Sequence, residues 1–221
     1  MLDIRGKRAV LYDLDGTLTD PGEGIVNSFR YALRAYGVPV REDPRFYYAV
    51  IGPPLADSFR EYAGFDRETA RMAVEKYREY FSEKGIFENR VYPGIPCLLE
   101  KNREAGRKNI VATSKPEGFT GRILEHFDLM RYIDGVSGAT MDEKRTLKKD
   151  VIAHALEAFR LRPEEVVMVG DRKHDAAGAA ACGVDFIGVS YGYGSEEELS
   201  AAGAGTIVRS VEELSRLLQI L

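Results

Sequence analysis

The sequence has few cysteine and histidine residues, which form disulfide bonds and bind metal ions in many small proteins. Only two of its 221 residues are cysteine, Cys97 and Cys182, and they lie far apart and outside any CxxC pattern. This spacing argues against a disulfide scaffold or a zinc ribbon, and we expect both thiols to be reduced, buried residues. The three histidines, His126, His154 and His174, share no spacing typical of a metal site.

Long apolar runs and signals for export are also missing. The apolar run from Ala176 to Val184 stops at Asp185, well short of a transmembrane helix. Residues 1–7 contain no apolar core of a signal peptide. We therefore expect a soluble, cytoplasmic protein with no membrane partner.

A strong charge of one sign is missing too. Thirty-one basic residues face 35 acidic ones, which gives a net charge of −4. Without a global basic field, a nucleic acid polymer is not an expected partner. Neither a Walker A sequence nor a GxGxxG following the first strand is present. A hydrophobic fraction of 44% is nevertheless ample for a folded core and excludes a disordered chain.

Short apolar runs alternate with longer amphipathic patterns along most of the chain. Because the runs are nearly continuous and rich in β-branched residues, they indicate strands buried on both faces. Strands that alternate with helices predict an α/β fold with a doubly wound parallel sheet. The predicted strands are Ala9–Tyr12, Asn109–Ala112, Val166–Val169, Phe186–Val189 and Thr206–Val208.

One region interrupts this alternation. Residues 18–89 contain helical patterns and no convincing strand, and the turn Val91-Tyr92-Pro93-Gly94 marks the return to the sheet. We expect an all-helical domain formed by residues 18–89, inserted into an α/β core formed by residues 1–17 and 90–221.

The turn after the first strand is the most informative segment. Asp13-Leu14-Asp15-Gly16-Thr17-Leu18 places two carboxylates directly after an apolar strand. Two like charges this close raise each other's proton affinity unless a cation intervenes. Gly16 permits a tight turn whose N–H groups can surround an anion. The alternative interpretation is a simple strand-end turn capped by aspartate.

Three further strand or helix ends carry polar residues that could join this turn, since ligands of such sheets gather where the strands end. Thr113 and Ser114 follow one strand, Lys148 begins a helix, and Asp171 and Asp175 follow another strand. Hydroxyl groups can donate to phosphate oxygens, and carboxylates suit a hard cation such as Mg²⁺. Helix capping is the alternative for each of the hydroxyl and carboxylate residues.

This ordered set resembles the motifs of the haloacid dehalogenase-like hydrolases, and the resemblance covers nearly the whole chain. Asp13 to Leu18 is similar to the first motif of that family, Thr113 to the second, Lys148 to the third, and Gly170-Asp171 with Asp175 to the fourth. Within the family, the helical insert resembles the cap of phosphoglycolate phosphatases. Two other stretches are similar to a branch described as 5′-nucleotidases, Thr113 to Glu117 and Tyr191 to Ser195.

The resemblance implies a Mg²⁺-dependent phosphatase that acts on small phosphomonoesters. Asp13 would be the nucleophile and Asp15 the general acid and base, while Thr113, Ser114 and Lys148 would bind the phosphate group. Asp13, the carbonyl oxygen of Asp15, and Asp171 or Asp175 would hold the metal. Phosphoglycolate and nucleoside monophosphates both stay open as substrates, as do a monomer and a homodimer.

The sequence departs from the family pattern at several points. Serine rather than asparagine follows Thr113, and lysine rather than proline follows Lys148, so Lys144 and Lys149 are rivals for the role of the site lysine.

A phospho-accepting receiver-type signalling domain is the main alternative function, because receivers also place Asp, Thr and Lys at strand ends. A binding protein without catalytic activity is a third possible function. In the insert, Arg41, Arg45 and Arg60 could meet an anionic substrate and Phe46, Tyr47 and Tyr48 could stack on a base, but surface charge and core packing are the favoured interpretations.

Overall fold

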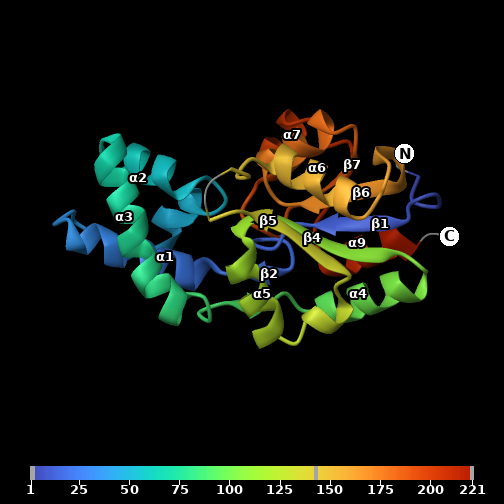
Figure 1. Ribbon diagram of the computed structural model, residues 1–221, viewed down its shortest axis with the longest axis horizontal. Helices are drawn as coiled ribbons and strands as arrows, with labels where there is room; N and C mark the ends of the chain where they lie inside the picture. Colours follow the sequence, from blue (N-terminus) through green and yellow to red (C-terminus); the bar gives the residue numbers. More distant parts are fainter. Residues whose placement is uncertain (1–2, 142–143, 220–221) are drawn as a thin grey trace. The chain divides into compact units, whose positions relative to one another are not determined.

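A parallel sheet organises the larger part of the molecule (Figure 1). Within residues 3–141 and 144–219, which this computed structural model describes, the sheet has six strands in the order β5-β4-β1-β6-β7-β8. All neighbouring strands run parallel. The strands are β1 (Ala9–Tyr12), β4 (Lys108–Pro116), β5 (Gly135–Ala139), β6 (Val166–Gly170), β7 (Asp185–Val189) and β8 (Ile207–Val208).

The two central strands are apolar along their length because helices cover both faces of the sheet. Every residue of β1 is fully buried, as are the four residues of β6 from Val166 to Val169. Helices α6 and α7 pack on one face, and α4, α5 and α9 lie on the other (Figure 1). The doubly wound α/β fold expected from the sequence is confirmed. The helices of this part are α4 (Ile95–Glu104), α5 (Glu117–His126), α6 (Lys148–Ala158), α7 (Lys173–Ala181), α8 (Glu196–Ala201) and α9 (Val211–Gln219).

The hydrophobic core beneath α6 and α7 fixes the position of the central strands. Leu11 of β1, Ile110 of β4 and Met168 of β6 are fully buried against Val151 and Ala155 of α6. Burying side chains of this size contributes about 1.5–3 kcal/mol each relative to exposure. The core therefore holds the carboxyl ends of β1, β4 and β6 side by side.

The chain divides into two compact units, one formed by residues 1–19 and 91–221 and the other by residues 20–90. The smaller unit is helical, and its boundaries differ by one or two residues from those expected. Its elements are α1 (Gly22–Ala35), the 3₁₀ helix η1 (Pro44–Val50), α2 (Leu55–Ala63), α3 (Arg67–Tyr80) and the π-helical turn η2 (Phe81–Gly85).

The chain passes between the units through two short strands that pair with each other. They are β2 (Thr19–Asp20) and β3 (Arg90–Val91). Next to this pair, Tyr92 N donates to Leu18 O at 3.1 Å, and the Arg90 guanidinium lies 2.6 Å from an Asp20 carboxylate oxygen. The sequence did not predict these two strands, which are too short to produce a hydrophobic pattern.

Other features also differ from the sequence-based expectations, since Cys97 is exposed and Cys182 only partly buried. Strand β5 was not expected, and β4 continues past Ala112 to Pro116 with a shift of register. Thr113 and Ser114 therefore lie in the last part of a strand rather than after it. The spacing of Leu214, Leu218 and Leu221 predicts one apolar face of a final helix; that helix is described as far as Gln219, and Leu221 is outside the described residues.

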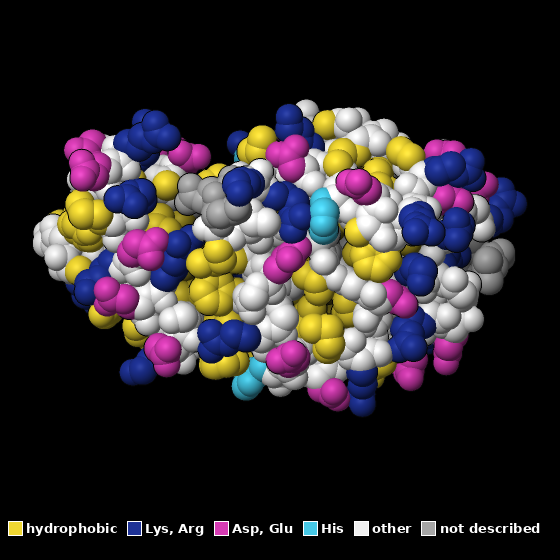
Figure 2. Space-filling model, viewed as in Figure 1, with side chains coloured by type: hydrophobic (Ala, Val, Ile, Leu, Met, Phe, Trp, Pro, Cys, Tyr) yellow, Lys and Arg dark blue, Asp and Glu magenta, His cyan; other side chains and the backbone are white. Residues whose placement is uncertain are grey.

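Charges of both signs are interspersed on the molecular face that Figure 2 shows, in keeping with the balanced composition. In the part of the chain that the structure describes, no helix has both the length and the apolar character needed to cross a membrane.

Candidate active site

The turn after β1 presents Asp13 at the carboxyl end of the sheet. Asp13 N donates to Val169 O at 2.9 Å, which extends the pairing of β1 with β6 by one residue. Leu14 N donates to Asp13 Oδ1 at 2.8 Å and restrains the carboxylate. The backbone then reverses at Gly16, whose φ is +82°. A Cβ atom at Gly16 would lie 2.2 Å from Asp171 Oδ2, so both the conformation and the close approach require glycine.

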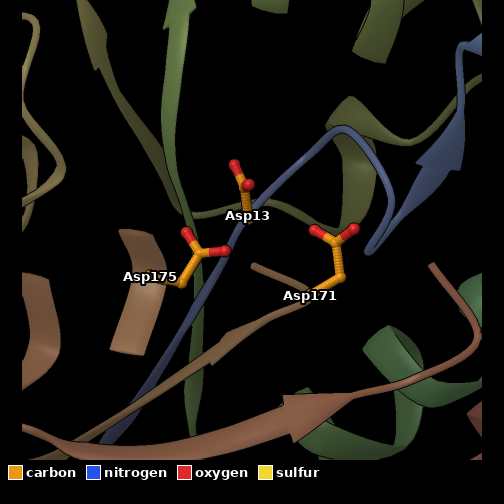
Figure 3. A group of neighbouring side chains, drawn as sticks. All are labelled: Asp13, Asp171 and Asp175. Atoms are coloured by element: carbon orange, nitrogen blue, oxygen red, sulfur yellow. The ribbon is translucent and has the colours of Figure 1, made fainter. Parts of the chain in front are cut away.

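Three carboxylates converge at this edge (Figure 3). Asp13 follows β1, Asp171 follows β6, and Asp175 lies in the first turn of α7. One carboxylate oxygen from each lies within 4.8 Å of the others, and the three residues are at most 9% exposed. The structure thus brings Asp13, Asp171 and Asp175 together at the carboxyl edge of the sheet.

The electrostatics of this cluster favour a bound cation. Burial raises the pKa of Asp171 well above its ordinary value, and the carboxylates of Asp175 and Asp13 raise it further. Burial also raises the pKa of Asp175, against the opposing effect of Lys148. Asp171 Oδ1 is buried and has no hydrogen-bond partner among the described residues. An orphaned oxygen in a buried acidic cluster fits a divalent cation such as Mg²⁺.

Glycines allow the loop after β7 to close over Asp171. Tyr193 N donates to Asp171 Oδ2 at 2.8 Å. A Cβ atom at Gly192 would lie 2.3 Å from Gly16 O and 2.5 Å from Asp171 Oδ2. The segment from Tyr191 to Ser195, which the sequence analysis singled out only by resemblance, thus holds one of the clustered carboxylates in place.

Lys148 is the lysine that reaches the cluster. Its Nζ lies 2.9 Å from Asp13 Oδ1 and 2.7 Å from Asp175 Oδ1, and it donates to Ala112 O at 3.1 Å. Burial lowers the pKa of Lys148, but the carboxylates of Asp13 and Asp175 outweigh burial and raise it overall. The two rivals, Lys144 and Lys149, are exposed.

Thr113 and Ser114, the two hydroxyl residues at the end of β4, differ in their burial. Thr113 is 2% exposed, and its Oγ1 accepts a hydrogen bond from Lys115 N at 3.2 Å. Ser114 is half-buried. The hydrogen bond from Lys115 N restrains the backbone next to Thr113, whereas the Ser114 side chain makes no hydrogen bond to the residues that the structure describes.

A second lysine, which the sequence analysis did not single out as a site residue, pairs with Asp15. Lys115 Nζ lies 2.8 Å from Asp15 Oδ2, and the two side chains are 7% and 16% exposed. Asp15 Oδ1 is buried without a hydrogen-bond partner among the described residues. The signal in the sequence was that Lys115 lies within Thr113 to Glu117, one of the stretches similar to the 5′-nucleotidase branch.

The arginines considered for substrate binding are residues of the helical unit, where two of them pair with neighbouring carboxylates. Arg45 lies 2.8 Å from Asp43, and Arg60 lies 3.7 Å from Asp57. Both arginine side chains are more than half exposed, so they are solvated surface charges in this structure.

The aromatic residues of this unit divide between its core and its surface. Tyr47 is fully buried, and its ring packs against Phe29, with the two ring centroids 6.0 Å apart. Phe46 is 43% exposed and lies beneath the guanidinium of Arg41, which is 3.9 Å from the ring centroid, and Tyr48 is 41% exposed. Core packing accounts for Tyr47, whereas Phe46 and Tyr48 are partly exposed.

The family follows from comparison with known proteins. Residues 10–189 match the family described as haloacid dehalogenase-like hydrolase. The chain belongs to this family. The match spans both units, and it confirms the resemblance inferred from the ordered motifs.

The relatives are named as phosphate-handling enzymes. The chain is 46% identical over 192 residues to a 5′-nucleotidase of Pseudomonas aeruginosa, covering 87% of this chain and 86% of the relative. It is 41% identical over 213 residues to the tyrosine-protein kinase PtkA of Mycobacterium tuberculosis, covering 96% of this chain and 72% of that one. A phosphoglycolate phosphatase of Vibrio parahaemolyticus is 26% identical, with 96% of each chain covered.

A solved structure shares the whole architecture. The crystal structure of a predicted phosphatase from Clostridium acetobutylicum matches with a TM-score of 0.93 at 46% identity, covering 97% of this chain and 99% of that one. The expected classification as a hydrolase of this family, with an α/β core, is therefore confirmed.

Proposed function

We propose that this protein is a Mg²⁺-dependent phosphatase that hydrolyses small phosphomonoesters through a phosphorylated Asp13. The observation that carries the proposal is the position of Asp13, whose carboxylate shares one buried site with Asp171 and with the Lys148 ammonium, 2.9 Å away. A phosphomonoester is a dianion, so an anionic nucleophile can approach it only where positive charge is concentrated. In this site, the Lys148 ammonium and a cation bound by the acidic cluster would supply that positive charge.

The metal would be held by Asp13, the carbonyl oxygen of Asp15 and Asp171. Among the described residues, Asp171 Oδ1 and Asp175 Oδ1 both lack a hydrogen-bond partner, but Asp171 Oδ1 also lacks an ion-pair partner, so Asp171 is the stronger candidate. The oxygens of Asp175 instead face Lys148 Nζ at 2.7 Å and Arg172 N, which donates at 3.0 Å. When bound, Mg²⁺ would offset the repulsion between Asp13 and the substrate dianion.

The reaction then divides between the side chains of this site. The Asp13 carboxylate attacks phosphorus and the ester P–O bond breaks, while Asp15 gives a proton to the departing oxygen. In the second half Asp15 takes a proton from water, which attacks phosphorus and releases Asp13. Thr113 and Lys148 would hold the phosphate oxygens, with Lys148 compensating their charge; the burial of Thr113 and the distance of 2.9 Å from Lys148 Nζ to Asp13 Oδ1 support these roles.

Several groups are needed at once because of the size of the barrier. Hydrolysis of a phosphomonoester requires an acceleration of up to ~10²¹-fold. A single general acid or base supplies about 10²–10⁴. Asp15 must therefore act together with the nucleophile, the lysine and the cation. Phosphoglycolate and nucleoside monophosphates are the substrate candidates, in keeping with the names of two of the relatives.

The substitution Asp13→Asn tests the proposal. It preserves the shape of the side chain but removes the nucleophilic charge, so phosphate release should fall to the uncatalysed level while circular dichroism stays unchanged. Asp150→Asn, on α6 and outside the acidic cluster, is the control and should retain activity. Substantial phosphate release by the Asp13→Asn protein would contradict the proposed nucleophile.

The final location of the phosphoryl group distinguishes a phosphatase from a receiver domain and from a protein kinase. A phosphatase releases many equivalents of inorganic phosphate per protein chain, whereas a receiver domain retains one equivalent. Transfer to a tyrosine, which the name of one relative suggests as an outcome, would leave phosphate bound to protein. A panel of phosphomonoesters compared by kcat/KM would then rank the substrates.

A further inference from the structure

The ion pair between Lys115 and Asp15 joins the end of β4 to the turn after β1. Lys115 comes from the end of β4, where the register shifts between Ala112 and Pro116 and where Lys115 N is tied to Thr113 Oγ1. Asp15 belongs to the turn after β1, where its neighbour Gly16 donates through its N–H to Thr19 O at 2.8 Å. The ion pair therefore links two segments in which local hydrogen bonds restrain the backbone.

The two oxygens of Asp15 have different surroundings. Oδ2 lies 2.8 Å from Lys115 Nζ, and Oδ1 is buried with no hydrogen-bond partner in the residues described. A buried polar atom without a partner costs free energy, so its persistence next to a reactive site calls for a functional explanation. The atom that lacks a partner at rest is the one that remains available to a substrate.

Resting on the proposed phosphatase function, we propose that Lys115 is a positioning residue for Asp15. It binds Oδ2 and thereby presents Oδ1 to the oxygen that must gain or lose a proton. In the first half-reaction the proton on Oδ1 moves to the leaving oxygen as the ester P–O bond breaks. In the second half, Oδ1 accepts a proton from the attacking water while Oδ2 stays beside the ammonium.

The two buried lysines of the site thus have separate partners. Lys148 lies against Asp13 and Asp175, and Lys115 lies against Asp15. Displacing a catalytic group by about 1 Å can cost as much as 10²-fold in rate. Loss of the Lys115 ammonium should therefore impair proton transfer while leaving the nucleophile and its own lysine in place.

Leaving groups that differ in their need for a proton provide the test. Phenyl phosphate and 4-nitrophenyl phosphate have similar size, but phenolate is the poorer leaving group and depends more on the general acid. The parameter kcat/KM is suitable because it reports on the first half-reaction, in which the leaving group departs. Asp15→Asn should lower kcat/KM more for phenyl phosphate than for 4-nitrophenyl phosphate.

We expect Lys115→Met to reproduce this selectivity, with kcat/KM for phenyl phosphate reduced by about tenfold or more, within the range of general acid catalysis. Lys115→Arg should recover part of the loss because it restores a cation. When combined with Asp15→Asn, Lys115→Met should cause no additional loss, because it acts through Asp15. Lys149→Met, on an exposed lysine of α6, is the matched control and should retain activity.

Three results would overturn the inference. The first is an equal loss of kcat/KM for phenyl phosphate and 4-nitrophenyl phosphate in the Lys115→Met protein. The second is a rise in its KM with unchanged kcat, and the third is a full additional loss of kcat/KM when Lys115→Met is combined with Asp15→Asn. Each of these results would indicate that Lys115 binds phosphate or has a structural role. If Lys115→Met does not fold, Lys115→Gln removes the charge and keeps a donor, and the same comparison applies. If Asp15→Asn lowers kcat/KM equally for the two substrates, the general acid role that the proposed function assigns to Asp15 is wrong, and the failure is not one of the inference about Lys115.

Discussion

Strand β6 is flanked by a carboxyl group at each end, and folding shifts their pKa values in opposite directions. Asp171, at the carboxyl end, is buried among like charges, which raises its pKa. Glu165, just before the strand, accepts hydrogen bonds from Arg162 N at 2.9 Å and from the Arg8 guanidinium at 3.0 Å. The hydrogen bonds from Arg162, followed by that from Arg8, lower the pKa of Glu165 to about 2. One strand thus connects a carboxylate of the acidic cluster to a carboxylate held by two arginines.

The structural role of Glu165 can be tested through pH. Because its pKa is lowered from 4.5 to about 2, its contribution to stability is complete above pH 4.5 and is lost as the pH falls through 2. Glu165→Gln should lower the urea midpoint at pH 7, and the difference from the native protein should shrink between these two pH values. Glu164→Gln, on the exposed neighbouring side chain, is the control. A difference that does not change with pH would contradict this role.

At the residue scale, sequence motifs predicted the positions of Asp13, Asp171 and Lys148 but not the role proposed for Lys115. Asp13 and Asp171 follow recognisable strands, and Lys148 begins a recognisable helix. The pairing of Lys115 with Asp15 depends on the irregular end of β4, where the register shifts. A local distortion of this kind has no hydrophobic periodicity, so the sequence gives little sign of which side chain it turns inward.

At the element scale, the contact between α6 and α7 connects packing to the site. A Cβ atom at Gly178 of α7 would lie 2.8 Å from Lys148 Cγ and 3.1 Å from the Lys148 carbonyl carbon. The absence of a side chain at position 178 therefore lets α7 approach the first turn of α6. This approach places the Lys148 ammonium near Asp175, which lies one turn earlier on α7.

Gly178→Ala should disturb both stability and activity. Alanine favours helices, but overpacking at a close contact costs about 1–3 kcal/mol. We expect a lower unfolding free energy and a lower kcat, because Lys148 must move. The matched control is Gly121→Ala in α5, where a Cβ atom meets nothing within 4 Å and the helix should gain about 0.5–1 kcal/mol. Equal stability changes in the two variants would contradict the packing argument.

Strand β5 shows why one element could not be predicted. Its sequence, Gly135 to Ala139, contains two glycines, and glycine is depleted in strands. A Cβ atom at Gly135 would lie 2.0 Å from the ring of Phe159, and one at Gly138 would lie 2.7 Å from Lys115 O. These close tertiary contacts, rather than strand propensity, explain the glycines. Strands β1 and β6 were predictable because burial on both faces leaves a plain apolar pattern.

At the scale of the whole molecule, the acidic cluster joins segments that lie far apart in the sequence. Asp13 comes from the first strand, and Asp171 and Asp175 come from positions more than 150 residues later. A cation that neutralises these carboxylates would hold the segments together only in the folded state. Metal binding should therefore stabilise the fold as well as support activity.

Thermal unfolding with and without metal measures this coupling. Mg²⁺ at 100 times its Kd should add about 2.7 kcal/mol to the unfolding free energy and raise Tm, and a chelator should reverse the change. Asp171→Asn should largely remove the shift, whereas Asp150→Asn should retain it. A Tm that is indifferent to Mg²⁺, or a full shift in the Asp171→Asn protein, would argue against metal binding at the cluster.

The pairing of β2 with β3, the two short strands that connect the units, bears on how the helical unit could be exchanged in evolution. Because the chain leaves and re-enters the sheet unit through adjacent strands, the two ends of residues 20–90 are tethered to each other at a fixed spacing. Any other segment with neighbouring ends could be spliced in at the same junction without altering the register of the main sheet. Recombination at this junction would replace residues 20–90 and leave unchanged the segments that carry the acidic cluster.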